Sequence, residues 1–126
     1  MKPNPRGKSG EEYAARILRQ HGYAILARNF SCRRGEVDII ATIGDIIVFA
    51  EVKTRRQNSM VSGAEAVTPG KQRKIIAAAL FYLQGHPCDL QPRFDVLCVE
   101  TGPDGEPCTY EHFQGAFDGE AYEKHY

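Results

Sequence analysis

The sequence predicts an α/β protein, a three-layer α/β/α sandwich with a central mixed sheet. Residues 37–42 and 46–53 are rich in β-branched side chains, and the compact turn Ile43-Gly44-Asp45 between them is typical of a β-hairpin. Both faces of this hairpin are largely apolar, so helices are expected above and below it. With 126 residues, the chain is long enough for one domain with a hydrophobic core and too short for two.

One helix is expected before the hairpin and another after it. The first has Ser9 as its N-cap and Glu12 three residues later, which is the pattern of a capping box, and Gly22 ends it. The second begins at Thr68 and Pro69, with the threonine as N-cap and the proline at the first helical position. Apolar residues at helical spacing supply the buried side of each helix.

The remaining segments complete the sheet and set the domain boundaries. Apolar segments bounded by turn residues indicate further strands at residues 23–30, 94–99 and 108–113. Residues 1–8, with two prolines and three basic residues, are expected to form a flexible basic arm, and residues 114–126 an acidic C-terminal tail. Residues 9–113 then form a single α/β domain.

Charge is unevenly distributed along a chain whose formal net charge is zero. Residues 1–74 hold 14 basic and 7 acidic residues, whereas residues 75–126 hold 2 and 9. This asymmetry indicates a nucleic-acid surface on the basic part, although accidental clustering on a solvated surface gives the same pattern. The sequence has neither an apolar run that would span a membrane nor a secretory signal, so we expect a cytoplasmic protein.

Acidic residues are predicted to meet across the hairpin. With a two-residue turn, Asp38 lies opposite Glu51, and their Cβ atoms are about 5 Å apart on one face of the sheet. Two carboxylates at this separation can share one cation. The same register sets Glu36 opposite Lys53 on that face. A slip of one residue would place Asp38 and Glu51 on opposite faces.

These residue types indicate a site for Mg²⁺ (or Mn²⁺). Two like charges at the end of an apolar strand resist burial unless a cation neutralises them, and oxygen ligands favour these ions. The candidate ligands are Asp38, Glu51 and the backbone carbonyl of Val52. Lys53 would orient an attacking water, lower its pKa or stabilise the pentavalent transition state. The alternative is a structural cluster of ion pairs at the sheet edge.

Several motifs of the chain resemble those of known nucleases. The run Glu36-Val37-Asp38-Ile39-Ile40, followed by Phe49-Ala50-Glu51-Val52-Lys53, resembles the split signature of the PD-(D/E)xK superfamily of restriction-endonuclease-like proteins. Residues 9–100 also resemble the YraN family of small bacterial proteins. The matching motifs include Gly10-Glu11, His21-Gly22-Tyr23, Ala27-Arg28-Asn29, Glu51-Val52-Lys53-Thr54-Arg55, Ala66-Val67-Thr68-Pro69, Lys71-Gln72-Arg73 and Arg93-Phe94-Asp95.

This resemblance implies a restriction-endonuclease-like fold, similar to that of archaeal Holliday junction resolvases. It also implies a metal-dependent endonuclease that hydrolyses phosphodiester bonds in structured or branched DNA. Asp38 and Glu51 would be the metal ligands and Lys53 the catalytic lysine. Glu11 would be the acid of the first helix, although a helix-start acid also interacts favourably with the helix dipole without any catalytic role. A homodimer is expected by analogy with resolvases.

Basic residues in the loops and at the helix start that follow the hairpin strands are candidate phosphate contacts. These are Arg33, Arg34, Arg55, Arg56, Lys71, Arg73 and Lys74. Binding should follow the shape of the DNA backbone, because no segment resembles a base-reading helix. Two other functions stay open: a nucleic-acid-binding module with little or no turnover, and a protein-interaction domain that uses the acidic C-terminal part. The roles of Glu36, Gln72 and Asp95 also stay open.

Overall fold

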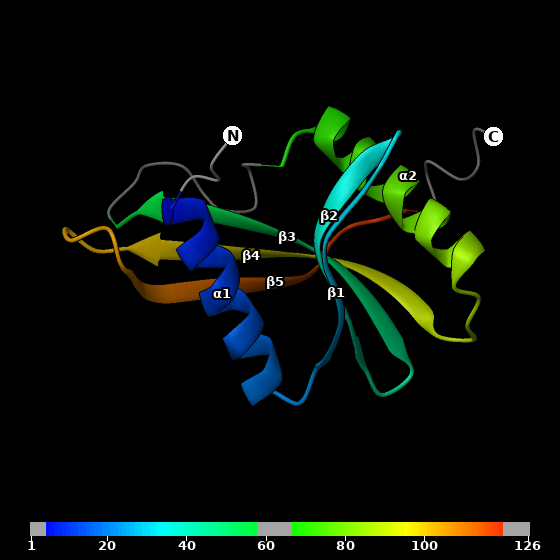
Figure 1. Ribbon diagram of the computed structural model, residues 1–126, viewed down its shortest axis with the longest axis horizontal. Helices are drawn as coiled ribbons and strands as arrows, with labels where there is room; N and C mark the ends of the chain where they lie inside the picture. Colours follow the sequence, from blue (N-terminus) through cyan, green and yellow to red (C-terminus); the bar gives the residue numbers. More distant parts are fainter. Residues whose placement is uncertain (1–4, 58–66, 120–126) are drawn as a thin grey trace.

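A mixed sheet and two helices make up the described part of this computed structural model, residues 5–57 and 67–119, with side chains described from residue 9 onward (Figure 1). The elements are α1 (Pro5–Gln20), β1 (Ala24–Cys32), β2 (Gly35–Ile43), β3 (Ile46–Arg56), α2 (Pro69–Gly85), β4 (Gln91–Thr101) and β5 (Pro107–Phe117). The strands lie side by side in the order β1-β2-β3-β4-β5. Strands β3 and β4, which α2 connects, are parallel, and the other neighbours are antiparallel. The predicted α/β class with a mixed sheet is confirmed.

The hairpin of β2 and β3 has the register that the sequence predicts. Ile43 lies opposite Ile46 at the turn, and pairing continues to Ile39 opposite Ala50. Gly44 in the turn has a φ of 55°, a left-handed conformation that glycine adopts without strain. The turn and the first half of the hairpin therefore follow from local sequence.

Helix α1 begins earlier than predicted. Its first residue is Pro5, so Ser9 lies inside the helix, and the N-cap and capping box predicted at Ser9 are wrong. Proline suits the first turn of a helix, where its missing N–H would have no partner in any case. Residues 1–4 of the expected arm lie outside the described residues. Within the described ranges, no helix is long and apolar enough to cross a membrane.

The strands are also longer than their apolar patterns indicate. β3 runs on to Arg56 because its last residues pair with β4. β5 runs on to Phe117, so the segment expected as an acidic tail starts within a strand. The rest of that segment, residues 120–126, and residues 58–66 of the expected loop after β3 lie outside the described residues.

Each helix packs against its own cluster of buried apolar side chains. Leu18 of α1 belongs to a cluster that includes Val48 of β3. Ile75 of α2 belongs to the other cluster, which includes Ile47 and Phe49 of β3. Successive residues of β3 thus alternate between the clusters, as expected for a strand buried on both faces. The two helices therefore lie against opposite faces of the sheet.

β2 and β3 stop pairing after Ile39 and Ala50, and the sheet forks there. In Figure 1, the start of β2 and the end of β1 turn toward α2, whereas β3 continues away from them beside β4. Gly35 permits this path, because a Cβ at this position would collide with the backbone carbonyl of Lys74 in α2. The close approach of β2 to α2 thus draws the β1–β2 turn away from β3.

The alternation of side chains along β2 changes at the fork. Val37 belongs to the cluster of α2 and Ile39 to the cluster of α1, although residues two apart in a regular strand share a face. On the neighbouring strand, Asn29 has a φ of 54° at the same level, between the two residues that pair with Ile39 and Val37. Two predicted ladder pairs beyond this point are therefore wrong: Asp38 opposite Glu51 and Glu36 opposite Lys53.

A buried polar network ties β4 to β5 and to the residue before β1. Arg93 donates to both carboxylate oxygens of Asp95, at 2.9 and 2.8 Å, and to the hydroxyl of Tyr23. His112 Nε2 lies 2.7 Å from Asp95 Oδ2, and the N–H of Gly115 donates to Oδ1 at 3.0 Å. Burial opposes ionisation of Asp95, but the bonds with His112, Arg93 and Gly115 outweigh it and lower its pKa. Asp95, whose role the sequence leaves open, joins strands here.

The start of α2 has the predicted cap. Thr68 Oγ1 accepts a hydrogen bond from the N–H of Lys71 at 3.2 Å, and Pro69 is the first helical residue. The side-chain amide of Gln72 donates to the carbonyl of Val67 at 3.1 Å. Gln72 thus holds the chain just before the helix.

Replacing Gly35 by alanine should lower the free energy of unfolding by about 1–3 kcal/mol, because the new methyl group must push β2 away from the backbone of α2. Gly70→Ala is the matched control. The nearest atom to a Cβ there, Nη2 of Arg73, is 3.8 Å away, and alanine favours a helix, so stability should stay equal or rise slightly. Urea unfolding measures both, and wild-type stability of Gly35→Ala would contradict the close approach.

Candidate active site

Asp38 occupies the fork between β2 and β3. Its Oδ2 accepts a hydrogen bond from the backbone N–H of Val52 at 2.8 Å. If the ladder continued, a backbone carbonyl of β2 would accept this hydrogen bond from Val52. The side chain of Asp38 replaces that carbonyl as the acceptor. The carboxylate therefore bridges the strands at the point where their backbones separate.

The pKa of Asp38 is raised to about 7. Burial is the largest cause, and the negative charge of Glu51 is the next, whereas the bond from Val52 acts in the opposite direction. The charge of Glu11 and a side-chain hydrogen bond with Glu51 raise the pKa further. Asp38 and Glu51 thus meet through their side chains, although they are not a ladder pair. Two carboxyl groups this close can hold a proton or a cation between them.

Glu51 is the most buried acid of the site, with 4% of its surface exposed. Its Oε1 lies 3.4 Å from Nζ of Lys53 and 3.5 Å from Nζ of Lys71. Its Oε2 is buried and has no hydrogen-bond partner in the part of the chain that the structure describes. A buried carboxylate oxygen without a donor is destabilising, so Oε2 marks the place where a cation would be most favourable.

α1 brings Glu11 toward the same acids. The preceding residue, Gly10, allows the helix to touch β3, because a Cβ there would collide with the hydroxyl of Thr54. Burial raises the pKa of Glu11, the charge of Arg28 lowers it, and the charge of Glu51 adds to the rise. Glu11 therefore belongs to the electrostatic environment of the site.

The donor set suits a hard divalent cation that keeps much of its water. Mg²⁺ usually takes one or two carboxylates and completes its coordination with water and phosphate oxygens, and Asp38 and Glu51 supply that number. The N–H of Val52, whose carbonyl is the predicted third ligand, is bound to Asp38. Among residues 5–57 and 67–119, no group of three or more His, Cys, Asp or Glu side chains is placed to hold a metal ion. A cation here would thus depend on solvent or substrate oxygens.

Four of the predicted phosphate contacts gather beside the site. They line a cavity of about 300 Å³ between the β1–β2 turn and the start of α2, together with Glu36. The four are Arg33, Arg34, Lys71 and Lys74. Because Lys71 also contacts Glu51, this basic cavity adjoins the acidic fork. Glu36 thus lies at the cavity and not opposite Lys53.

The other three predicted phosphate contacts lie elsewhere. Arg55 pairs with Glu100 at 2.9 Å and lies 3.9 Å from Glu111, so acids of β4 and β5 already balance its charge. Arg56 and Arg73 are exposed and do not line the basic cavity. The basic surface beside the fork is therefore smaller than the sequence predicts.

Two sets of contacts were not predicted from the sequence. Lys71, expected only to bind phosphate, also pairs with Glu51, and no local pattern connects a helix start with a strand before it. The network around Asp95 is the other. Arg93 and Asp95 are two residues apart on a strand and hence on one face, and that spacing is a usable signal for their ion pair.

Asp38→Asn should change how stability depends on pH. The folded-state pKa of about 7 lies above the ordinary 3.8, so the folded protein holds the Asp38 proton more tightly than the unfolded chain does. The resulting contribution to the free energy of unfolding is fully present below pH 3.8 and is lost as the pH rises toward 7. Asparagine stays neutral and retains an acceptor for Val52. When urea unfolding is measured with a chelator present, the free energy of unfolding of the variant should rise by a few kcal/mol relative to that of wild type as the pH goes from 3.8 to 7.

Asp45→Asn is the control for this measurement, because Asp45 is exposed in the β2–β3 turn. Its stability should follow the wild-type pH profile. A constant difference between wild type and Asp38→Asn from pH 4 to pH 7 would show that Asp38 does not titrate in this range.

Sequence comparison relates the chain to one group of proteins. A family model described as "Uncharacterised protein family UPF0102" matches residues 10–99. A UPF0102 protein of Syntrophus aciditrophicus (strain SB) is 47% identical over 113 residues, which cover 89% of this chain and 87% of that protein. One of Pseudomonas aeruginosa (strain LESB58) is 36% identical over 119 residues, with 90% and 92% covered. The chain therefore belongs to the UPF0102 family, which is the YraN family that its motifs resemble.

Proposed function

We propose that this protein is a metal-dependent endonuclease of the PD-(D/E)xK type that hydrolyses phosphodiester bonds in structured or branched DNA. The proposal is carried by the meeting of Asp38 and Glu51 at the fork, where one buried oxygen of Glu51 has no donor among the described residues. Lys53 lies beside the same carboxylate. Two acids that can hold a metal ion and a lysine beside them are groups that metal-assisted phosphodiester hydrolysis can use.

Each side chain has a distinct part in the proposed reaction. Mg²⁺ or Mn²⁺ held by Asp38 and Glu51 would polarise the phosphate and lower the pKa of an attacking water. Lys53, 3.4 Å from Glu51, orients that water and balances the negative charge that develops on the phosphate. Lys71, which also contacts Glu51, binds a phosphate oxygen from the side of α2. Glu11 adds negative charge, which favours a bound cation.

The proposal includes a three-layer α/β/α sandwich of the restriction-endonuclease type. Its support is that α1 and α2 pack on opposite faces of the mixed sheet and that the acids gather at the fork of its central strands. The resemblance of the motifs to those of Holliday junction resolvases supports branched DNA as the substrate and a homodimer as the assembly. A cytoplasmic location goes with this substrate.

A nucleic-acid-binding module with little turnover is the second candidate. The observation that favours it is the state of Glu51, which already has two lysines beside one of its oxygens. A carboxylate neutralised in this way holds the fork together without a metal. The basic cavity would then bind phosphates and no bond would break.

DNA cleavage tests the first candidate. In Mg²⁺ or Mn²⁺, wild type should cut four-way junctions or flaps faster than plain duplex. Lys53→Ala and Asp38→Asn should each lower the rate about a hundredfold or more, because each removes a group that acts on the reacting atoms. Asp45→Asn, which changes an exposed acid in the β2–β3 turn, should cleave like wild type.

Calorimetry with Mn²⁺ gives a readout that does not depend on activity. Wild type should bind the ion, and Glu51→Gln should lose binding because Oε2 no longer carries negative charge. Equal cleavage by wild type, Asp38→Asn and Lys53→Ala would contradict the proposed enzyme. Salt-dependent DNA binding without Mn²⁺ binding or cleavage would favour the second candidate.

A further inference from the structure

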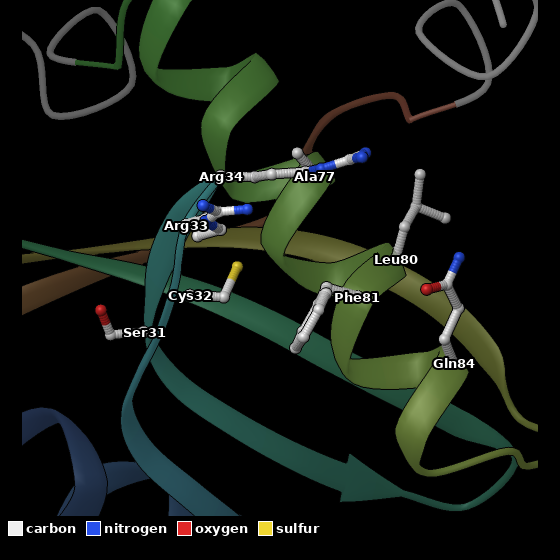
Figure 2. Close-up of a pocket in the computed structure, with 8 residues that line it drawn as sticks. All are labelled: Ser31, Cys32, Arg33, Arg34, Ala77, Leu80, Phe81 and Gln84. Carbon is white, nitrogen blue, oxygen red and sulfur yellow. The ribbon is translucent and has the colours of Figure 1, made fainter.

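A larger cavity adjoins the basic one on the side away from the acids. It measures about 460 Å³ and lies between the β1–β2 turn and the second half of α2. Figure 2 shows its main side chains: Cys32 at the end of β1, Arg33 and Arg34 on the turn, and Leu80, Phe81 and Gln84 on the helix. Ser31 to Arg34 line both cavities, so the two cavities adjoin each other along the turn. We call the two cavities together the turn groove.

The arginines of the turn groove have no acidic partner among the described residues. Arg33 and Arg34 form no ion pair with any acid in the described part of the chain. By contrast, Arg28, Arg55 and Arg93 each pair with an acid at 2.7 to 2.9 Å. Both Arg33 and Arg34 are also exposed. Their charges are thus available to an external anion.

Phe81 gives the same groove an open aromatic surface. With 52% of its surface exposed, it is one of two exposed large hydrophobic residues in the described ranges, the other being Leu26 on β1. Its ring lies 6.3 Å from the ring of Phe30, which in turn packs edge-on against Tyr82 at 5.2 Å. The ring is therefore supported from inside and open on its outer side.

We propose that the turn groove holds an unstacked nucleotide of a single-stranded segment, with its base against Phe81 and its phosphates against Arg33 and Arg34. An aromatic ring beside arginines that have no acidic partner among the described residues is a combination that recognises single strands, because every base has a face for stacking and every linkage has a charge. This inference rests on the proposed function and names its substrate: DNA with a single-stranded segment beside the cleavable bond, such as a flap.

The occupant is a nucleic acid and not an acidic peptide because of where the groove leads. Its basic end includes Lys71, whose Nζ is 3.5 Å from Glu51, so one strand can follow the groove from Phe81 to the acids. The cavity at Phe81 has the volume of a small-molecule pocket, which admits a base and not a duplex. A base paired and stacked inside a duplex cannot present its face to Phe81.

Binding measurements with a single-stranded oligonucleotide and a duplex of the same sequence test the inference. Phe81→Ala should lower the ratio of single-strand to duplex affinity about fivefold to a hundredfold, because base–aromatic stacking is lost. Leu26→Ala is the matched control, since Leu26 is an equally exposed apolar residue outside the groove, and it should leave the ratio unchanged. Phe81→Leu keeps an apolar contact with Phe30 but lacks an aromatic face, and it should behave like Phe81→Ala.

A second experiment tests the proposed contact between the arginines of the turn groove and the phosphates. Arg33→Gln should make single-strand binding less sensitive to salt, because one phosphate contact is lost. Arg19→Gln, an exposed arginine at the end of α1, is its control. In addition, 2-aminopurine in the oligonucleotide should be quenched by wild type and by Leu26→Ala, and less by Phe81→Ala.

Each failure has its own meaning. If Phe81→Ala changes neither the affinity ratio nor the quenching while wild type still cleaves DNA, the inference is overturned and the proposed function stands. If wild type shows no salt-dependent DNA binding at all, both fall together. If Phe81→Ala weakens a glutamate-rich peptide carrying a tyrosine but not the oligonucleotide, the groove is a peptide site and the inference is overturned.

Discussion

Val52 donates its N–H to a carboxylate oxygen of Asp38, and this 2.8 Å bond lies just past the last ladder pair of β2 and β3. A backbone donor inside a fork of strands would lose its partner if no side chain replaced the departing strand. Asp38 supplies that acceptor and is thereby fixed beside Glu51. The end of the hairpin and the place of Asp38 thus belong together, and Lys53 of β3 and Lys71 of α2 both lie beside Glu51.

A proton on Asp38 and the two lysines beside Glu51 balance the charges at the fork, and a divalent ion could take the place of the proton. A raised pKa lets Asp38 keep a proton near neutral pH, and the two lysines stand beside Glu51. A divalent ion bound between the acids would replace the proton and weaken the attraction of Glu51 for its lysines. Lys53 and Lys71 would then be free to contact phosphate oxygens. The lysines beside Glu51 thus have two parts: they balance its charge when no ion is bound, and they serve the proposed reaction when one is.

Local features of the site could be predicted from the sequence and long-range ones could not. The register of the hairpin follows from Gly44 and from apolar alternation, and the cap at Thr68 follows from neighbouring residues. The end of the ladder depends on Gly35 touching α2, a contact between distant segments that no period in the sequence encodes. The motif around Ser9 failed for another reason, because a serine and a glutamate at capping-box spacing also fit inside a helix.

The fork and the turn groove both arise where β2 leaves β3 and its first residues approach α2. When β2 leaves β3 after Ile39, the gap on the β3 side receives Asp38, while the β1–β2 turn arrives at α2 and encloses the groove. Gly35 allows the turn to approach the helix this closely, because a Cβ there would collide with the backbone of Lys74. Lys71 lies where the two meet, with contacts to both. A strand held in the groove would thus be positioned relative to the acids by the backbone itself, without a separate recognition element.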